Sequence, residues 1–585
     1  LCFCILLSAT AYSQAPQKQL AAKRLTSTIK IDGTLDDVAW KDAPAAKNFV
    51  EWRPTAGAKE GFNSRTEVYI LYDNSSIYIG GYCHESAIDS ISRELAGRDK
   101  VGSNDFVGII FDTYNDKING SGFYVTPLGE QYDAKYSNTS GEDDSWDAVW
   151  YSEAKIQKDG WTFEMRIPYS ALRFSSKGKD WGLNITRKRN KSGKQYMWNP
   201  VVPTINGFIN QEGLFTGITD IKPPVRLSLS PYFSTYINYY PSPVAGEKKT
   251  TASINGGMDV KYGINQNYTL DMTLIPDFGQ VQSDNTVLNL SPFEVRYNEN
   301  RAFFTEGTEL FNKGGLFYSR RVGSQPIHLY DVAGKLNTNE HIVDNPSESK
   351  LINATKISGR GQKGLGIGFF NAITKPMYAK VEDDKGNSRK IETNPLTNYN
   401  IIVFDQTLKN NSSISLINTN VLRNGTDYDA NVTAVVFDIY DKKNRYNVYG
   451  KIASSSLTGN GKSTTGYAHN LGFGKTGGRF NFNLNQDLTD DKYDINDMGI
   501  LFNNNELMHF FWVGYKWVKP GKWYNNMYLN FNNNLSHRFK DGAYQSYNLN
   551  VNVNGQLKNL WYAGLFVNRV FEGNDYYEPR KAGRV

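Results

Sequence analysis

Cysteine is scarce in this sequence, with three in 585 residues. Cys2 and Cys4 lie in the first apolar stretch, so Cys83 alone remains for the body of the protein. A single cysteine excludes an intramolecular disulfide, and we expect Cys83 to be a small core residue. Packing and hydrogen bonds, rather than covalent cross-links, must therefore hold the fold together.

Long apolar runs are missing after residue 13. No stretch approaches the roughly 20 residues of a membrane-spanning helix, so membrane insertion would require a closed β-barrel. The apolar start, followed by Ala11, Tyr12 and Ser13, indicates a secretory signal peptide over residues 1–13. Because an initial Met and a basic region before this stretch are lacking, we expect the sequence to be a fragment.

No block of like charge stands out, and the net charge is only +6 with 21% charged residues. This balance argues against a disordered tail and against a nucleic-acid partner. Aromatic residues, in contrast, make up 14% of the chain, with 37 Tyr and 31 Phe. Such a content suits strands, sugar-binding surfaces and the aromatic girdles of membrane barrels, so the composition favours an all-β protein.

Catalytic signatures are also lacking. The six histidines are scattered without metal-ligand spacing, and no HExxH, GxSxG or GxxxxGK motif occurs. The glycine pattern GRGQKG at residues 359–364 is followed by a strand-like alternation rather than by a helix, so it does not predict a dinucleotide site. We assign no catalytic residue.

What is present divides into two parts. Residues 24–220 show short strand-like runs broken by Gly, Asn and Asp, which is typical of a β-sandwich. Trp161 and Trp181 fall in strand patterns and Trp40 ends the turn DGTLDDVAW, and we expect all three to pack in the core. Two prolines in IKPPVR, residues 221–226, then mark a boundary. We therefore expect a second domain over residues 225–585.

In this second part the strands lengthen and their polar face becomes almost uncharged. In WYNNMYLNFNNNL, residues 523–535, apolar side chains share one parity and most asparagines share the other. Roughly fourteen to sixteen such segments occur, many reaching the ~9 to 11 residues of a tilted transmembrane strand. The pattern predicts a large antiparallel transmembrane β-barrel. A soluble sandwich or barrel, whose strands also alternate, is the alternative.

Residues 276–321 interrupt the alternation with acids, arginines and phenylalanines. The carboxylates cannot face lipid, and the Phe rings would be wasted in a free loop. We expect the segment to fold inside the barrel as a plug or lumen-lining element, where charges pair and rings pack. The candidate residues are Arg296, Glu299, Arg301 and Glu306. An ordinary extracellular loop is the alternative.

Two resemblances sharpen these predictions. Residues 24–220 resemble the carbohydrate-binding module family 9-like domain through the ordered stretches IKIDGTLDDVAW, TEVYILYDNSSIYIGGYC, DFVGIIFDTYND, YVTPLGEQYDAKY, GWTFEMRIPYSALRF and WGLNITRKR. This resemblance implies a β-sandwich that binds sugars through an aromatic clamp with polar side chains, and calcium in some members.

The long stretch PDFGQVQSDNTVLNLSPFEVRYNENRAFFTEGTELF with LFYSRRVG resembles a domain of unknown function that follows this module in Gram-negative outer-membrane proteins. It implies a β-barrel without an established activity. The sequence ends without the terminal aromatic residue usual in such barrels, so we expect the last strands to be missing.

Sugar binding points to specific candidates, because a sugar offers C–H faces to an aromatic ring and hydroxyls to polar side chains. Trp52 and Trp146 lie in irregular polar stretches where a ring can stay exposed for stacking. Arg98 and Asp99 could contact the hydroxyls, with surface ion pairing as the alternative.

Calcium is the one cofactor that we consider, and none is required. Asp105, Asp112 and Asp116 could supply oxygen ligands to Ca²⁺. Asp-rich turns, however, often only cap and bend the chain.

Together these features predict a protein of the cell outer membrane, with a periplasmic sugar-binding module, that binds or handles glycans at the cell envelope. Its partners would be an oligo- or polysaccharide and the outer-membrane lipid. A glycoside hydrolase is one alternative, because such modules often accompany these catalytic domains. An envelope adaptor that docks a protein partner is another. A hydrolase would release reducing ends, a binding module would bind without turnover, and an adaptor would do neither.

Overall fold

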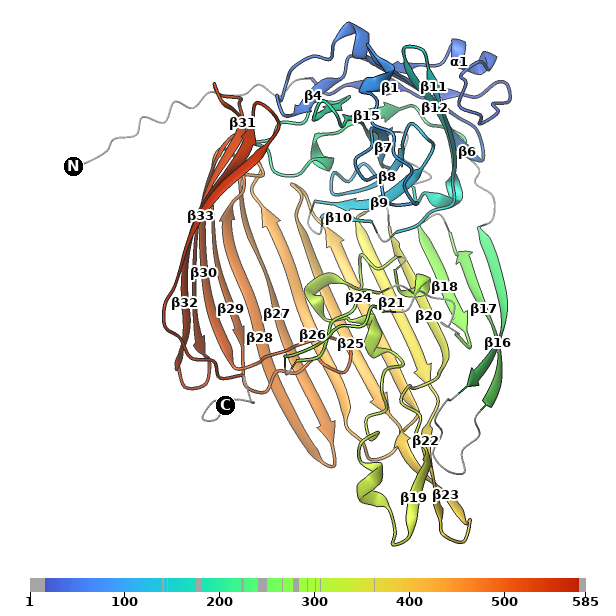
Figure 1. The fold of residues 1–585 in the computed structure, drawn as a ribbon, viewed down its shortest axis with the longest axis vertical. Coiled ribbons are helices and arrows are strands. Elements are labelled where there is room, and N and C mark those ends of the chain that lie inside the picture. The colour runs from blue at the N-terminus through green and yellow to red at the C-terminus, as the bar shows by residue number, and fades with distance from the viewer. Residues whose placement is uncertain are drawn as a thin grey trace, which may run out of the picture.

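The computed structural model describes most of the chain. The described residues are 16–138, 141–144, 146–174, 180–221, 226–239, 250–265, 267–276, 284–291, 293–299, 301–305, 307–361 and 363–577. The signal peptide expected at residues 1–13 lies outside them. Strands dominate both halves, in a sandwich of two sheets and one very large antiparallel sheet (Figure 1). The predicted all-β class is confirmed.

The N-terminal half is a sandwich. Its larger sheet has nine strands, in the order β1 (Gln19–Ala21), β15 (Gly213–Thr216), β13 (Asp180–Arg189), β7 (Phe106–Asp112), β8 (Asn119–Val125), β9 (Gln131–Ser137) and β10 (Gly141–Asp143), with β14 (Lys194–Met197) on β13 and β4 (Val50–Arg53) on β14. Its smaller sheet has six strands, in the order β11 (Tyr151–Gln157), β12 (Gly160–Pro168), β6 (Ser76–His84), β5 (Thr66–Tyr72) and β2 (Lys23–Arg24), with β3 (Ala45–Ala46) on β5.

The core of the sandwich lies between these two sheets, because each contributes one apolar face to it. Trp161 from β12 and Trp181 from β13 are almost completely buried there, as predicted, and Cys83 is buried beside them. Trp40 is also buried, in a smaller cluster with Leu71. The shared core holds the two sheets, and with them the loops at their edges, in place.

Helices are short. They are α1 (Val38–Lys41), α2 (Ala302–Thr305), η1 (Phe62–Ser64), η2 (Ile88–Ser90), η3 (Tyr169–Ala171), η4 (Ile209–Gln211), η5 (Lys313–Gly315), η6 (Ser319–Arg321) and η7 (Val332–Lys335). Within the described residues, none has the length and apolar content needed to cross a membrane.

The C-terminal half is built on a sheet of fifteen antiparallel strands, within the number expected from the sequence. In order they are β16 (Leu227–Tyr239), β17 (Thr250–Gly263), β18 (Tyr268–Leu274), β20 (Leu351–Arg360), β21 (Leu365–Thr374), β24 (Thr397–Thr407), β25 (Ser413–Arg423), β26 (Asp429–Tyr440), β27 (Tyr446–Gly459), β28 (Lys462–Lys475), β29 (Phe480–Thr489), β30 (Glu506–Trp517), β31 (Tyr524–Arg538), β32 (Tyr544–Leu557) and β33 (Tyr562–Val570). In the described part of the chain, β16 and β33 do not pair with each other.

The two faces of this sheet differ in what covers them. On β24, Ile401 and Val403 are completely buried, whereas Ile402 and Phe404 are 40% and 44% exposed. The strand registers place exposed apolar residues of the neighbouring strands on the same face as Ile402 and Phe404, so that they form one apolar band across the sheet. The band consists of Phe369, Ile402, Phe404, Ile414, Leu416, Val435, Ile439, Val448, Ile452, Leu471, Phe473, Leu484, Leu529, Val551, Leu565 and Val567. We call this surface the outer face and the opposite one the inner face.

The described part of residues 276–321 covers the inner face. Phe304, Leu310, Phe311 and Leu316 share one apolar cluster with inner-face residues of the sheet. Phe370 of β21 lies at its centre, since the rings of Phe303, Phe304, Phe311 and Phe317 have centroids 5.5 to 6.4 Å from its own. The segment is thus packed against the sheet rather than extended into solvent.

Lysines also fix this segment to the sheet. Lys451 of β27 donates from Nζ to the Gly314 carbonyl over 2.9 Å. Lys356 of β20 donates to the Phe303 carbonyl, and Lys313 of the segment pairs with Asp405 of β24. Each bond satisfies a polar group inside an otherwise apolar contact, so the segment has a defined position.

The sandwich sits at one end of the large sheet (Figure 1, top). Arg173 donates to Ser358 over 3.3 Å, Asn206 donates to Tyr440 over 3.3 Å, and the Gly478 amide donates to the Thr204 carbonyl over 2.8 Å. The strand connections at this end are short, namely residues 361–364, 408–412, 441–445, 476–479, 518–523 and 558–561.

The opposite end carries the long connections, residues 275–350, 375–396 and 490–505, beside short ones at residues 424–428, 460–461 and 539–543. A three-stranded sheet projects from it (Figure 1, bottom). Its strands are β19 (Glu340–Asp344), β22 (Met377–Asp383) and β23 (Ser388–Asn394). The two ends of the large sheet therefore differ in both loop length and cover.

Candidate functional site

A cluster of polar side chains beside an aromatic ring lies at the rim of the sandwich core. Gln131, Asp133 and Lys135 are alternate residues of β9, so their side chains share one face of that strand. A turn at residues 98–99 and a loop at residues 146–148 close over this face through contacts to Asp133. The site is thus assembled from three separate stretches of the chain.

Arg98 connects these stretches. Its Nη2 lies 2.7 Å from Asp133 Oδ1 and 2.9 Å from Asp147 Oδ1, and it donates to the Ala148 carbonyl over 2.8 Å. Asp99, held with a positive φ of 63°, donates its amide to the Gln131 carbonyl over 2.9 Å. Arg98 and Asp99 thereby lie together with Asp147, next to Trp146.

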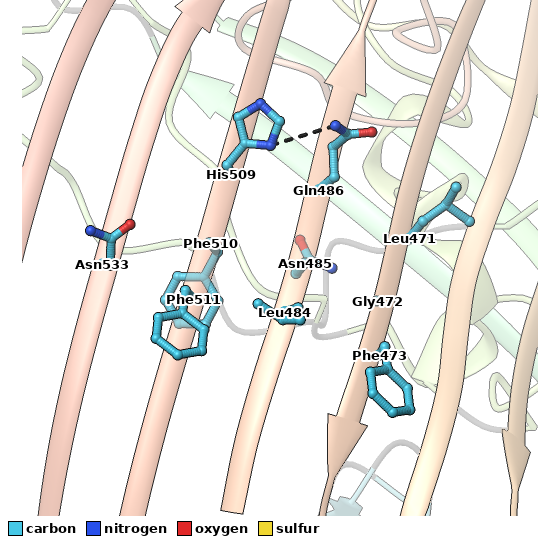
Figure 2. A pocket seen from close by; sticks show the side chains of 10 residues that line it. All are labelled: Leu471, Gly472, Phe473, Leu484, Asn485, Gln486, His509, Phe510, Phe511 and Asn533. Atoms are coloured by element: carbon cyan, nitrogen blue, oxygen red, sulfur yellow. Dashed lines mark hydrogen bonds between the residues drawn. The ribbon is translucent and has the colours of Figure 1, made fainter. Parts of the chain in front are cut away.

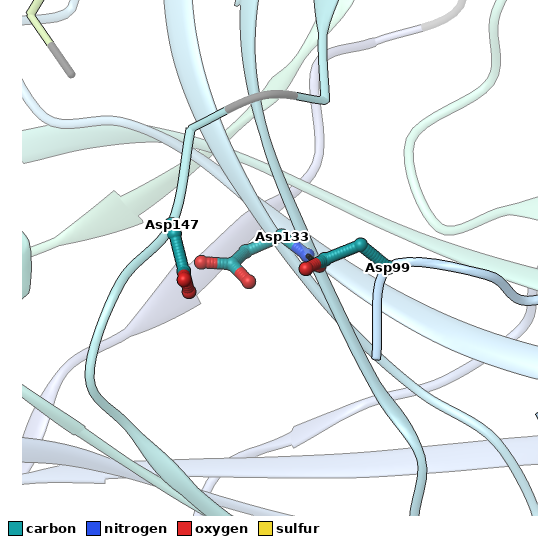
Figure 3. A group of neighbouring side chains, drawn as sticks. All are labelled: Asp99, Asp133 and Asp147. Atoms are coloured by element: carbon teal, nitrogen blue, oxygen red, sulfur yellow. Dashed lines mark hydrogen bonds between the residues drawn. The ribbon is translucent and has the colours of Figure 1, made fainter. Parts of the chain in front are cut away.

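Three carboxylates meet here, from Asp99, Asp133 and Asp147 (Figure 3). One oxygen of each lies within 4.8 Å of the others. Burial raises the pKa of Asp133 to about 7, although the Arg98 guanidinium and the Ala148 amide act in the opposite direction. Because Arg98 already pairs with all three carboxylates, it supplies much of the positive charge that a metal ion would otherwise bring.

Trp146 lies beside this group and is half-buried. Its ring packs edge-to-face on Phe123, with centroids 5.8 Å apart. The Lys135 ammonium lies 4.0 Å above the ring centroid and donates to Ser121 over 2.7 Å. The expectation of an open ring is therefore met only in part, because Lys135 covers one of its faces.

Trp52 lies in a different part of the module. It sits on β4 with the Arg53 guanidinium 4.0 Å from its ring centroid. In the nine-stranded sheet, β4 is separated from β9 by β14, β13, β7 and β8, and five strand spacings amount to roughly 24 Å. The structure therefore brings Arg98, Asp99 and Trp146 together but leaves Trp52 apart.

The three aspartates considered for calcium do not share one site. Asp105 precedes β7 and Asp112 ends it, so seven residues of extended strand, roughly 20 Å, separate them. Asp112 and Asp116 do share a turn, in which Asp112 accepts the Lys117 amide over 2.7 Å and Asp116 accepts the Ile118 amide over 2.8 Å. The capping role considered as the alternative is thus observed for these two.

Glu212 is a partner of Asp112 that sequence reasoning missed. Both side chains are 1% exposed, and both pack over the bare Cα of Gly182. Burial, with the Asp116 carboxylate nearby, raises the pKa of Asp112 to about 7, and burial together with Asp112 raises the pKa of Glu212. Neither carboxylate oxygen of Glu212 has a hydrogen-bond partner in the described residues. No sequence pattern connects positions a hundred residues apart, so only the fold shows this pair.

Of the four charged residues expected to line the inside of the barrel, Glu299 and Arg301 pair with each other. Glu299 accepts hydrogen bonds from Arg301 Nε over 2.8 Å and Nη2 over 2.7 Å. The Arg296 guanidinium lies 5.9 Å from the ring centroid of Tyr318. Glu306 lies outside the described residues.

A shallow hollow on the large sheet, over β28 to β31, is mainly apolar (Figure 2). Phe473, Leu484 and Phe511 line it, and the His509 ring nitrogen lies 3.5 Å from the amide of Gln486. It continues the apolar band of the outer face, so we assign no separate chemistry to it.

Solved structures similar to this chain fall into two groups, which cover about a third and about four fifths of it. The carbohydrate binding module family 9 from Caldicellulosiruptor kristjanssonii in complex with cellotriose is 15% identical, with 35% of this chain and 96% of that chain covered and a TM-score of 0.25. A putative carbohydrate-binding protein from Bacteroides uniformis is 14% identical, with coverages of 34% and 99% and a TM-score of 0.28. OccAB2 of Acinetobacter baumannii is 9% identical, with coverages of 80% and 91% and a TM-score of 0.25.

Family models match both halves of the sequence, whereas a search of curated proteins gave no match. Residues 31–202 match the carbohydrate family 9 binding domain-like model, and residues 223–585 match the domain of unknown function DUF5916. Both resemblances seen in the sequence are confirmed. This chain is therefore a member of the DUF5916 family that carries a carbohydrate family 9 binding domain-like module ahead of the family domain.

Proposed function

We propose that this protein captures glycans at the periplasmic mouth of an outer-membrane barrel. The observation that carries this proposal is the cluster on β9, where the ring of Trp146 lies against Lys135 and Arg98 pairs with Asp99 and with Asp147, the residue after Trp146. A ring for the C–H face of a sugar next to groups that bond hydroxyls is the combination that sugar recognition requires. The match of residues 31–202 to the family 9 model supports it.

The outer face supports a place in a membrane. Soluble proteins rarely expose contiguous apolar surfaces that extend across a whole sheet. Here the exposed band continues from Phe369 on β21 to Val567 on β33. Strands such as β26, β27 and β28, with 12, 14 and 14 residues, exceed the ~9 to 11 residues needed to cross a bilayer at a tilt. We infer that lipid covers this band.

Loop length supports a periplasmic position for the module. In outer-membrane barrels, the periplasmic turns are short and the extracellular loops are longer. The module contacts the end of the sheet that carries the short turns, through Ser358, Tyr440 and Gly478. The three-stranded sheet would then project from the cell surface.

We further propose that residues 276–321 limit passage through the barrel. Their described part occupies the inner face, where Phe311 packs on Phe370 and Lys313 pairs with Asp405. Ion pairs at Glu299 and an apolar cluster hold this part compact. An ordinary extracellular loop would not bury its rings against the barrel wall.

Neither alternative gains a specific observation. A glycoside hydrolase needs an acid and a second carboxylate that both reach the substrate. Asp133 has a raised pKa suited to an acid, but it is completely buried behind Arg98. The adaptor alternative predicts no sugar binding and is decided by the same binding experiment.

Calcium is proposed at Asp112 and Glu212 rather than at the three aspartates considered from the sequence. Two adjacent buried carboxylates repel each other, and the oxygens of Glu212 have no protein donor in the described residues. Oxygen donors of this kind fit a hard divalent cation. Bound calcium would neutralise the pair and so stabilise the module.

The first prediction concerns the sugar site. Trp146→Ala in the full-length protein should weaken glycan binding by roughly 1 to 3 kcal/mol, because it removes a large apolar contact surface. Trp52→Ala is the matched control and should bind like the parent. A glycan array followed by titration calorimetry measures both. Loss of binding in Trp52→Ala alone would place the site elsewhere, binding to no glycan would favour the adaptor, and release of reducing ends would favour the hydrolase.

The second prediction concerns the membrane. Phe404→Arg should reduce the heat-modifiable, folded form in outer-membrane fractions, because an arginine at the lipid face costs roughly 2 to 4 kcal/mol near the bilayer centre. Ser388→Arg, at an exposed position of β23 in the projecting sheet, is the control and should assemble normally. Recovery of the parent as a soluble monomer without detergent would contradict the membrane proposal.

The third prediction concerns passage. Replacing residues 303–317 by a short Gly-Ser linker should raise the single-channel conductance of the complete protein and the sensitivity of cells to large antibiotics, since the inner face would be uncovered. Shortening the turn at residues 384–387, at the tip of the projecting sheet, is the control. Unchanged conductance at normal expression would show that the segment does not obstruct the barrel.

The fourth prediction concerns calcium. Millimolar Ca²⁺ should raise the melting temperature of the module by roughly 5 °C, because a ligand bound only to the folded state stabilises it. Glu212→Gln should abolish the shift, whereas Asp105→Asn, at the other end of β7, should keep it. Differential scanning calorimetry with and without EDTA tests this. An equal shift in the Glu212→Gln variant would place calcium at another site.

A further inference from the structure

Basic residues gather where the module, the wall of the large sheet and residues 276–321 meet. The Tyr114 hydroxyl of the module interacts electrostatically with Arg173, Arg226, Arg360 and Glu309. Its oxygen is buried and has no hydrogen-bond partner in the described residues. The Lys135 ammonium interacts electrostatically with Glu309, Arg173 and Lys261. The cluster consists of Lys135 and Arg173 from the module, Arg226 just before β16, Lys261 of β17 and Arg360 of β20.

Arg173 marks the meeting point of all three parts. Its Nη2 donates to Ser358 of β20 over 3.3 Å, and a Cβ atom at Gly307 of the 276–321 segment would lie 3.7 Å from the same nitrogen. Ser358 points to the inner face of the sheet, like its cross-strand partner Thr269. The cluster therefore faces the inside of the large sheet rather than its lipid-facing side.

Lys135 joins this cluster to the sugar site. Its ammonium lies 4.0 Å above the ring centroid of Trp146. The same ammonium interacts electrostatically with Arg173 and Lys261, which belong to the basic junction. A saccharide lying at Trp146 would therefore have its next residues beside these cations.

Positive charge predominates at the junction. Asp405 balances Arg360 through a direct ion pair, and two acids, Glu309 and Asp271, lie among the four remaining cations. Burial and the neighbouring Arg173 lower the pKa of Arg226. Burial lowers the pKa of Lys135 to about 8, with Arg173 and Lys261 acting in the same direction and Glu309 and Asp133 against it. Neighbouring cations make each other's charged form less favourable, and a bound anion reverses this effect by supplying the opposite charge.

We propose that the captured glycan is an acidic saccharide, with a sugar ring at Trp146 and its carboxylate or sulfate groups along Arg173, Arg226 and Lys261. Guanidinium and ammonium groups form charge-assisted hydrogen bonds with both kinds of anion. This inference rests on the proposed capture of glycans and adds the chemical class of the ligand.

The test uses the full chain in detergent and an array of acidic glycans, each paired with its neutral methyl-esterified or desulfated form. The acidic member of a bound pair should bind at least about tenfold more tightly at 50 mM NaCl, and the difference should shrink at 500 mM because salt screens the attraction. Equal affinities within pairs would overturn the charge inference and leave glycan capture standing. Binding to neither member would overturn both.

Variants locate the effect. Lys261→Gln should weaken the acidic ligand about tenfold and leave its neutral partner unchanged, since the neutral form has no anion for this cation to bind. Arg173→Gln, which also breaks the bond to Ser358, should have the same effect. Lys385→Gln, in the projecting sheet, is the control. Unchanged selectivity in Lys261→Gln would overturn the inference.

The pH profile gives an independent readout. An anion beside Lys135 raises the pKa of that ammonium above its free value of about 8. Because Asp133 titrates near pH 7 and affects both ligands alike, the readout is the ratio of acidic to neutral affinity, which should fall as the pH rises through 8. Parallel profiles for the two ligands would contradict a role for Lys135.

Discussion

The structure depends on the two-residue period of the large sheet. Adjacent side chains of a strand point to opposite faces, so Ile401 and Val403 are buried while Ile402 and Phe404 remain exposed. A slip of one residue in any strand pair would exchange the two sets. The register seen here keeps one face complementary to residues 276–321 and the other continuously apolar. The packing of residues 276–321 on the inner face and the apolar band on the outer face both follow from that division.

The inner face then explains how the parts become one unit. Phe370 provides the apolar contact, and Lys356 and Lys451 donate to carbonyls of the 276–321 segment. The same segment reaches the module at Gly307, beside Arg173. Sugar site, basic junction and inner face are therefore continuous in space, although β9 and β24 are far apart in the sequence. We regard this continuity as the physical basis for linking capture to passage.

Local patterns were sufficient for much of the fold. Alternation predicted the long strands, and apolar strand positions predicted the burial of Trp161, Trp181 and Cys83, because both depend only on neighbouring residues. Composition and motif order likewise predicted a sandwich followed by a large sheet.

Long-range pairing set the limit at the sites. The contact of Arg98 with Asp133 and Asp147 requires two loops to close over β9, and no local signal encodes that closure. Strand order placed Trp52 five positions away from β9 and separated Asp105 from Asp112 along β7. Glu212 meets Asp112 only because β13, with Gly182, lies between β15 and β7. Such pairs can be read from a sheet topology but not from spacing in one sequence.

The most direct test of the account examines the two faces of β24 in a lipid bilayer. Single cysteines at positions 401 to 404 carry a nitroxide label, and the native Cys83 is buried, so background labelling should be low. The account predicts that labels at 402 and 404 collide with lipid-soluble oxygen but not with a water-soluble nickel complex, whereas labels at 401 and 403 are protected from both. Collision of the 402 and 404 labels with the water-soluble reagent would contradict the assignment of the outer face to lipid.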